Sequence, residues 1–221
     1  MQKPWHIENT LRERVQGWEP WQGSYYELSM AYRWLSHQER LGLLQCAWSD
    51  VNLLGVVESP EQFGHPWHDP ATVDPADASH CYGYIRLVDG HLTGCGSYFT
   101  SWENATWFSL YIPLGQLDQI FPVHYPLGDE DEQWISIVDA SLAAVGAQIY
   151  CQMAFQVAAL GEEVSGFPIQ SVLAHLANAH NLLVPETLFT HHHIAPYGKS
   201  MGEGVWWTGG GDGREILAID G

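Results

Sequence analysis

The most regular hydrophobic pattern in the chain runs from Asp129 to Met153, where apolar residues recur three and four positions apart. The apolar positions are Trp134, Ile137, Val138, Leu142, Val145 and Ile149. This spacing predicts a long helix with one buried face. Its four opening carboxylates, at 129–132, suit the partial positive charge of a helix start. Phe155 to Leu160 follow as a short apolar run that predicts an interior strand. We expect this helix and this strand to form the nucleus of the domain.

The first part of the chain predicts a strand and then a capped helix. Residues 24–33 alternate in side-chain character, which is typical of a half-buried strand. Ser36 and Glu39 have the spacing of a capping box. The apolar positions after them predict a helix from His37 to Ser49. A turn is expected near Gly55.

Turn residues divide the middle of the chain into further strands. Residues 58–79 contain four prolines and are predicted to be a loop. Asp89-Gly90 stands between two alternating runs and predicts a hairpin with a type I′ turn. In the register of that turn Cys81 lies opposite Tyr98. Residues 107–112 predict one more strand, which a proline ends.

The C-terminal part of the chain predicts a helix and a last hairpin. The helix is expected at 169–179, and residues 191–204 are interpreted as a loop. Residues 205–208 and 214–219 predict the hairpin, with the glycine-rich stretch 209–213 as its turn.

Together these elements predict an α+β fold with a mainly antiparallel sheet. The expected core order is β-α-β-β-β-α-β, a split βαβ-like arrangement in which both helices cover one face of the sheet. We predict a single domain over residues 1–221. It divides into an N-terminal arm at 1–23, a core at 24–166 and a C-terminal extension at 167–221.

The most unusual feature of the composition is the excess of acidic residues. Eight Lys and Arg stand against 26 Asp and Glu, which gives a formal net charge of −18. Between Arg86 and Lys199 there are eleven acidic residues and no Lys or Arg. Such a surface repels nucleic acid and anionic membranes and attracts a cationic partner. Simple solubility is the alternative explanation.

The four cysteines, at positions 46, 81, 95 and 151, are scattered and form no CxxC pair. The N-terminus has no secretory signal pattern, and no run approaches 18 apolar residues. We therefore expect reduced thiols, no membrane span and a cytoplasmic location.

Twelve histidines raise the question of a metal site. The run His191-His-His193 cannot easily place all its rings on one ion, because neighbours in an extended chain point to opposite sides. His65, His68 and His80 match no zinc spacing. The stretch at 209–213 lacks the lysine of a phosphate-binding loop. The sequence thus predicts no cofactor, no metal and no catalytic residue.

Several short stretches carry a resemblance. They are Tyr25-Tyr-Glu-Leu28, the helix with Trp48, His80-Cys-Tyr-Gly83, Gly94-Cys-Gly96, the stretch 107–117 containing YIPLG, and the stretch 159–166 ending in EVSG. Together they resemble a group of bacterial α+β proteins over residues 24–166. That group is similar in style to immunity proteins of bacterial toxins. The resemblance implies a binding function and carries over no catalytic residue.

Two functions of different classes follow. The first is an acidic immunity-type protein that neutralises a cationic toxin domain by occluding its active site. The candidate partner-binding residues are Trp102, Glu103, Asp129, Glu130, Asp131, Glu132, Glu162 and Glu163. The second is a metal-assisted hydrolase that uses loop histidines with Glu162 or Glu163. Mimicry of nucleic acid by spaced carboxylates is a third, weaker idea.

Overall fold

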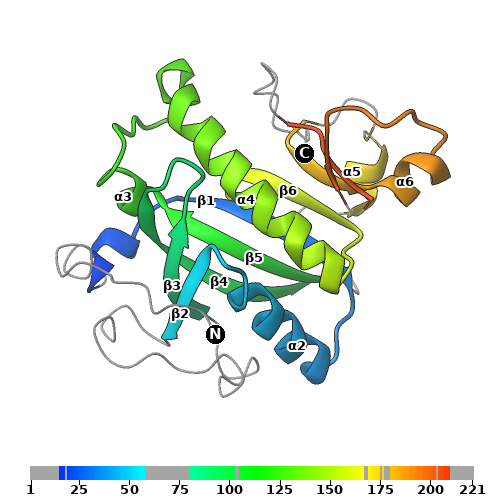
Figure 1. Cartoon of the computed structure of the whole chain (residues 1–221), viewed down its shortest axis with the longest axis horizontal. Helices are drawn as coiled ribbons and strands as arrows, with labels where there is room; N and C mark the ends of the chain where they lie inside the picture. The colour runs from blue at the N-terminus through cyan, green and yellow to red at the C-terminus, as the bar shows by residue number, and fades with distance from the viewer. Residues whose placement is uncertain are drawn as a thin grey trace.

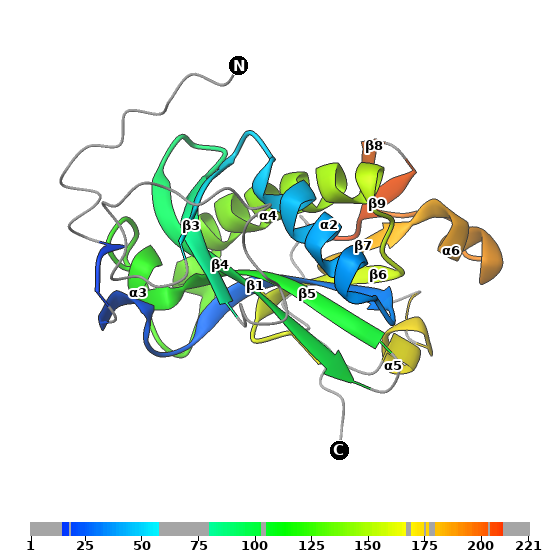
Figure 2. The ribbon, with the colours of Figure 1, turned by 90° about the horizontal axis from the view of Figure 1, so that it is seen from below.

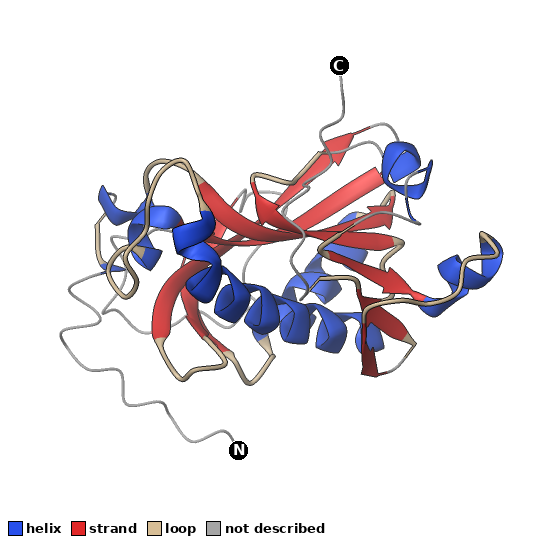
Figure 3. Ribbon diagram, turned by 90° about the horizontal axis from the view of Figure 1, so that it is seen from above, coloured by secondary structure: helices blue, strands red, loops and turns tan. Residues whose placement is uncertain are grey.

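A computed structural model describes residues 15–17, 19–57, 80–102, 105–166, 169–174, 176, 180–202 and 204–209. Within these ranges the chain forms one nine-stranded antiparallel sheet with helices on both faces (Figures 1 and 3). The strand order is β2-β3-β4-β5-β1-β6-β7-β9-β8. The predicted α+β class with a mainly antiparallel sheet is confirmed.

The strands are β1 Tyr25–Arg33, β2 Leu53–Val57, β3 His80–Arg86, β4 Leu92–Trp102, β5 Ala105–Pro113, β6 Val157–Glu162, β7 Leu182–Pro185, β8 Lys199–Gly202 and β9 Val205–Trp207. The helices are α2 His37–Trp48, α3 Leu114–Leu117, α4 Glu132–Gln152, α5 Ile169–Ala174 and α6 Glu186–His191. Two 3₁₀ turns, η1 Glu19–Trp21 and η4 Asp129–Asp131, stand before β1 and α4.

The long helix predicted from its apolar spacing is α4, which lies across one face of the sheet beside α2 (Figure 1). Its buried residues pack on the strand side chains that point the same way, among them Leu28 and Met30 of β1. Helix α2 begins with the predicted capping box, because Ser36 accepts from the Glu39 amide and Glu39 accepts from the Ser36 amide. Both predicted helices therefore cover the same face.

The opposite face of the sheet is covered too, so β1 is not half-buried as its alternation predicts. Helix α5 packs there with Ala31 and Trp107, on the side away from α4 (Figure 2). Even the polar side chains Glu27 and Ser29 are completely buried. Alternation shows which side chains share a face of a strand, but it does not show whether later segments will cover that face.

The hairpin of β3 and β4 differs from the prediction by one residue. His80, rather than Cys81, lies opposite Tyr98. Gly90 has φ +94° while Asp89 has no positive φ, and the Gly90 amide donates to the Leu87 carbonyl at 2.9 Å. This is a type I turn followed by one left-handed residue, which adds a residue to the loop and shifts the register. The consequence is that His80 joins the face that carries Glu27.

Three expectations from the sequence differ from the structure. The expected turn near Gly55 is the edge strand β2, which pairs with β3. The expected loop at 191–204 contains the end of α6 and strand β8. Strand β9 lies between β7 and β8, so it has no free edge for the predicted pairing with 214–219. β8 and β9 pair with each other instead, and Gly202 and Gly204, at their adjoining ends, have φ angles of +86° and +76°.

Some predictions fall outside the described residues. These are the loop at 58–79, most of the arm at 1–23, and the strand at 214–219. At the end of the arm, the Trp21 indole donates to the Val15 carbonyl at 2.7 Å and packs edge-on against Tyr82. All four cysteines are free thiols, and Cys81 and Cys95 are buried.

One described helical segment, Asp129–Gln152, is long and apolar enough to cross a membrane by length and composition. The expectation of no membrane span counted uninterrupted apolar residues, whereas this segment has polar residues among its apolar ones. More than half of its most apolar window is buried inside the protein, 56%. That burial is typical of the core helix of a soluble protein.

Candidate functional site

Most of the carboxylates predicted to bind a partner lie at one end of the sheet. Tyr26, near the start of β1, pairs with Ile112 on one side and with Glu162 on the other. The Trp134 ring, in the first turns of α4, lies 6.0 Å from the Tyr26 ring. The beginning of α4, the beginning of β1 and the ends of β5 and β6 therefore meet.

We call this region the acidic end. Its exposed or partly exposed carboxylates are Asp89, Asp118, Asp129, Glu130, Glu132, Glu162 and Glu163. Asp89 belongs because His91 of the same hairpin packs on Phe121, which stacks on Trp134 in the first turn of α4; the Asp89 carboxylate itself is bonded to His91 at 2.7 Å. Asp118 belongs because α3 directly follows β5. Among the described residues, this hairpin carries one basic side chain of the Lys or Arg type, Arg86 at the end of β3. The acidic end thus combines carboxylates from four separate parts of the chain.

Asp131 does not belong to the exposed set, which corrects the prediction for that residue. Its side chain is completely buried and accepts from the amides of Gly128 and His124, at 2.9 and 3.0 Å, and from the Trp134 indole at 2.8 Å. Burial by itself would raise the pKa of Asp131, but these hydrogen bonds outweigh it and lower the pKa to about 2. The Asp131 carboxylate holds the loop before α4 in place and cannot contact a partner.

Trp102 lies at the opposite end of the sheet from the acidic end. It pairs with Ala105, which in turn pairs with Arg33 at the far end of β1. Strand β5 separates the two ends by roughly 26 Å at about 3.3 Å per residue. Trp102 is 58% exposed, whereas Glu103 is outside the described residues. The predicted partner-binding residues therefore do not form one surface.

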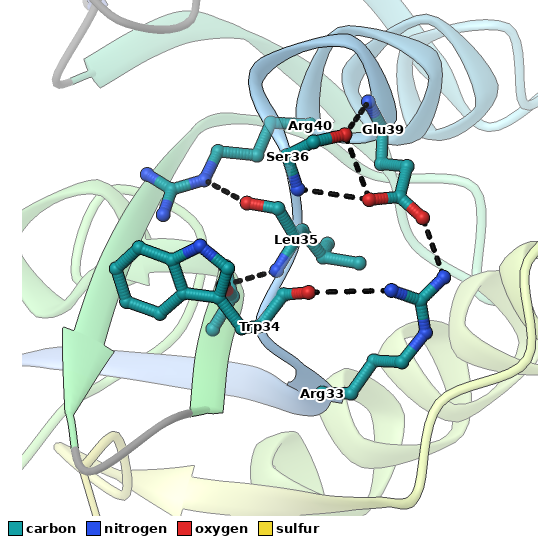
Figure 4. Close-up of polar contacts among 7 residues, drawn as sticks. Arg33, Trp34, Leu35, Ser36, Glu39 and Arg40 are labelled. Atoms are coloured by element: carbon teal, nitrogen blue, oxygen red, sulfur yellow. Dashed lines mark hydrogen bonds and ion pairs between the residues drawn. The ribbon is translucent and has the colours of Figure 1, made fainter.

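The surroundings of Trp102 are cationic and aromatic. The Arg40 guanidinium lies over the rings of Trp34 and Phe99, 5.5 and 5.9 Å from their centroids. Figure 4 shows Arg40 donating to the Leu35 carbonyl and Arg33 bridging to Glu39. Trp34 is 56% exposed. Sequence patterns did not indicate this surface, because its residues come from a loop, a helix and the end of a strand.

The face of the sheet opposite α4 holds a polar cluster centred on Glu27. Its carboxylate accepts from the Ser165 amide at 2.7 Å and from the Tyr98 hydroxyl at 2.8 Å. The Tyr98 and Ser165 hydroxyl oxygens are 2.9 Å apart, and those of Tyr98 and Tyr25 are 3.3 Å apart. Burial raises the pKa of the Glu27 carboxyl, and the hydrogen bonds oppose that rise. We call Glu27, Tyr98 and Ser165 the Glu27 cluster.

Sheet register brings this cluster together. Tyr82, Gly96, Tyr111 and Glu27 form one row across β3, β4, β5 and β1, and His80, Tyr98, Ser109 and Ser29 form the next. The Tyr111 ring lies directly over Gly96, where a Cβ atom would overlap it. The rings of His80, Tyr98 and Tyr111 pack with centroids 5.5 to 6.3 Å apart. The cluster is therefore closely packed with aromatic rings.

Another buried carboxylate, Asp139, lies on the face of the sheet that α4 covers. It accepts from the Tyr26 hydroxyl at 2.7 Å and from the Asn181 amide group at 3.1 Å. Asn181 also accepts from the Trp207 indole at 2.9 Å. Burial is the main cause that raises the pKa of Asp139 to about 6. These bonds connect α4 and β1 to the C-terminal strands.

The described histidines do not converge on a metal site. Among the described residues, no group of three or more His, Cys, Asp or Glu side chains is placed to hold a metal ion. His191 ends α6, and His192 and His193 follow it in a turn. His65 and His68 lie outside the described residues. The geometry thus adds no support to the hydrolase alternative.

Comparison of the chain with protein-family models, with curated proteins and with solved structures found no match. The function must therefore be argued from the surfaces and clusters described above.

Proposed function

We propose that this protein is a non-catalytic binding protein that docks a cationic protein partner on its acidic end. The observation that carries the proposal is the gathering of carboxylates from four separate parts of the chain at one end of the sheet. Charge of one sign on a rigid surface favours encounter with a partner of opposite charge, and the effect is strongest at low salt.

The immunity-type function is the specific form of this proposal. A toxin domain that acts on nucleic acid or another anionic substrate has a basic active site, and an acidic surface can cover that site. The mechanism is occlusion and needs no chemistry from the inhibitor. The residues we assign to contact are Asp129, Glu130 and Glu132 around the start of α4, with Glu162 and Glu163 at the end of β6. Trp102 and Asp131 are left out, because one lies at the far end and the other is buried.

The experiment measures binding of a fluorescent deca-lysine peptide by anisotropy, with deca-glutamate as the opposite probe. We expect salt-sensitive binding of deca-lysine and no binding of deca-glutamate. Each of Glu130→Gln, Glu132→Gln and Glu163→Gln should weaken binding about two- to fivefold at low salt, the usual range for an exposed ion pair.

Glu186→Gln is the matched control, because it removes one exposed carboxylate at the start of α6, away from the acidic end. If this control weakens binding as much as the three test variants do, the attraction comes from the net charge of −18. That result would contradict a defined acidic end. If the test variants alone weaken binding, a catalytically inactivated cationic toxin domain is the next partner to measure.

A further inference from the structure

The chain at 162–166, at the end of β6, carries two of the proposed contact residues, and one of them has an unusual backbone conformation. Glu163 has φ +48°, which side chains other than glycine rarely adopt, and Gly166 has φ +86°. The Glu163 amide donates to the Tyr25 carbonyl at 3.2 Å, and Val164 is buried. A left-handed residue persists only where the surroundings hold it in place. The question is which contacts hold this turn.

The Glu27 cluster supplies these contacts. The Ser165 amide and hydroxyl are bonded to Glu27 and Tyr98, respectively, so the turn is fastened to the sheet two residues after Glu163. The bonds reach across 138 sequence positions between Glu27 and Ser165. The strands β1 and β4 therefore hold the 162–166 turn in place through these hydrogen bonds.

The burial of the Glu27 carboxylate by itself lowers the stability of the fold. Its side chain is fully buried, and no Lys, Arg or His of the described residues forms an ion pair with it. A buried carboxylate without a cation costs free energy, which the hydrogen bonds that it accepts must offset. The packing of the sheet therefore gives no reason for a carboxylate here. Both of its oxygens are instead engaged with the groups that hold the turn.

We propose that Glu27 is a positioning residue, whose buried carboxylate holds the 162–166 turn so that Glu162 and Glu163 face a cationic partner. The inference rests on the proposed function in one respect, the use of the two glutamates for binding. The fastening of the turn by Glu27 is independent of any partner. The two parts can therefore be tested separately.

The central variant is Glu27→Leu in the full chain. We expect only a modest change of its thermal midpoint, because relief of the buried carboxylate offsets part of the cost of leaving the Tyr98 hydroxyl and the Ser165 amide without an acceptor. We also expect hydrogen exchange of the Ser165 amide, followed by NMR, to become at least about tenfold faster, since the amide loses its acceptor. Deca-lysine binding should weaken by about the same factor as in Glu163→Gln. A residue that only stabilises the sheet would change the thermal midpoint without a selective change in exchange at Ser165.

Two further variants complete the experiment. Glu27→Gln keeps an oxygen that can accept from the Ser165 amide, so most of the protection should return. Thr93→Val is the control, because Thr93 is a buried polar residue of the same sheet that bonds to the Gln116 carbonyl and not to the turn. If Glu27→Leu does not fold, Tyr98→Phe removes the hydroxyl contacts and should accelerate Ser165 exchange in the same direction.

The outcomes separate the two proposals. Unchanged Ser165 exchange in Glu27→Leu, or equal acceleration in Thr93→Val, overturns the positioning role. Faster exchange with a weakened affinity for deca-lysine supports both parts. Faster exchange in Glu27→Leu with unchanged binding in Glu163→Gln supports the fastening of the turn, and overturns its role in binding a partner.

Discussion

Asp139 gives a sharp test of the buried polar contacts, through the variant Asp139→Asn. The carboxylate is 8% exposed, and its pKa is raised to about 6 from an ordinary value of 3.8. The native state therefore binds a proton here more tightly than the unfolded chain does. The resulting stability is fully present below the unfolded pKa and is lost as the pH rises through about 6.

The magnitude follows from the shift. About two pKa units correspond to about 3 kcal/mol between the fully protonated and fully ionised limits, at about 1.4 kcal/mol per unit. Between pH 8 and pH 5 the wild type should gain about 1.4 kcal/mol from this group. The amide that replaces the carboxyl group in the variant does not titrate. The stability of the variant relative to the wild type should therefore be highest at pH 8 and fall by about that amount at pH 5.

The assay is urea unfolding at several pH values between 5 and 8, followed by tryptophan fluorescence. The quantity of interest is the difference in unfolding free energy between the variant and the wild type, in which the titration of all other groups cancels. A difference that does not change with pH would refute the reasoning. A variant that becomes less stable relative to the wild type as the pH rises would mean that the pKa is lowered instead of raised.

Three further predictions concern separate parts of the fold. Ser36→Ala removes the side-chain cap of α2 and should cost about 1 kcal/mol in urea unfolding; a loss below about 0.3 kcal/mol would show that the cap is not needed. Gly83→Ala should cost about 3 kcal/mol, because its Cβ would overlap the carbonyl oxygens of Gly55 and Leu54 in β2. Gly128→Ala is its control, since the nearest atom to that Cβ lies 3.9 Å away, and equal losses in both variants would contradict the steric argument. Trp102→Ala should leave the affinity for deca-lysine unchanged within about twofold, since Trp102 lies at the opposite end from the carboxylates; a larger loss would show that the peptide also binds at the Trp102 end of the sheet.

Local pattern was enough to predict the elements whose own sequence determines them. The apolar spacing of α4, the capping box of α2 and the alternation of β1 each lie within one segment, and each predicted element was confirmed. The short strands β2, β7 and β8 were missed, because strands of four or five residues have too few positions to show a period. Their pairing is decided by neighbours in the sheet.

The candidate site was predictable only in part, because its residues meet through register. Glu162 and Glu163 were correctly noted at a strand end, but the sequence could not show that Ser165 beside them bonds to Glu27. Tyr98 and His80 share a row only because Gly90 adds one residue to the hairpin loop. Asp131 looked like its three acidic neighbours in the sequence, and only the loop geometry around it distinguishes it. The placement of Ser165 against Glu27 depends on a contact between residues that are distant in sequence, which a local pattern cannot show.

The central position of β1 also constrains the order of folding. This strand precedes both of its sheet neighbours in the chain, and they are complete only at Pro113 and then at Glu162. Until then its apolar residues have no sheet to join, and the closure of such long loops makes folding slow compared with that of locally connected proteins. An unpaired apolar strand of this kind is prone to aggregate until both neighbours have joined it.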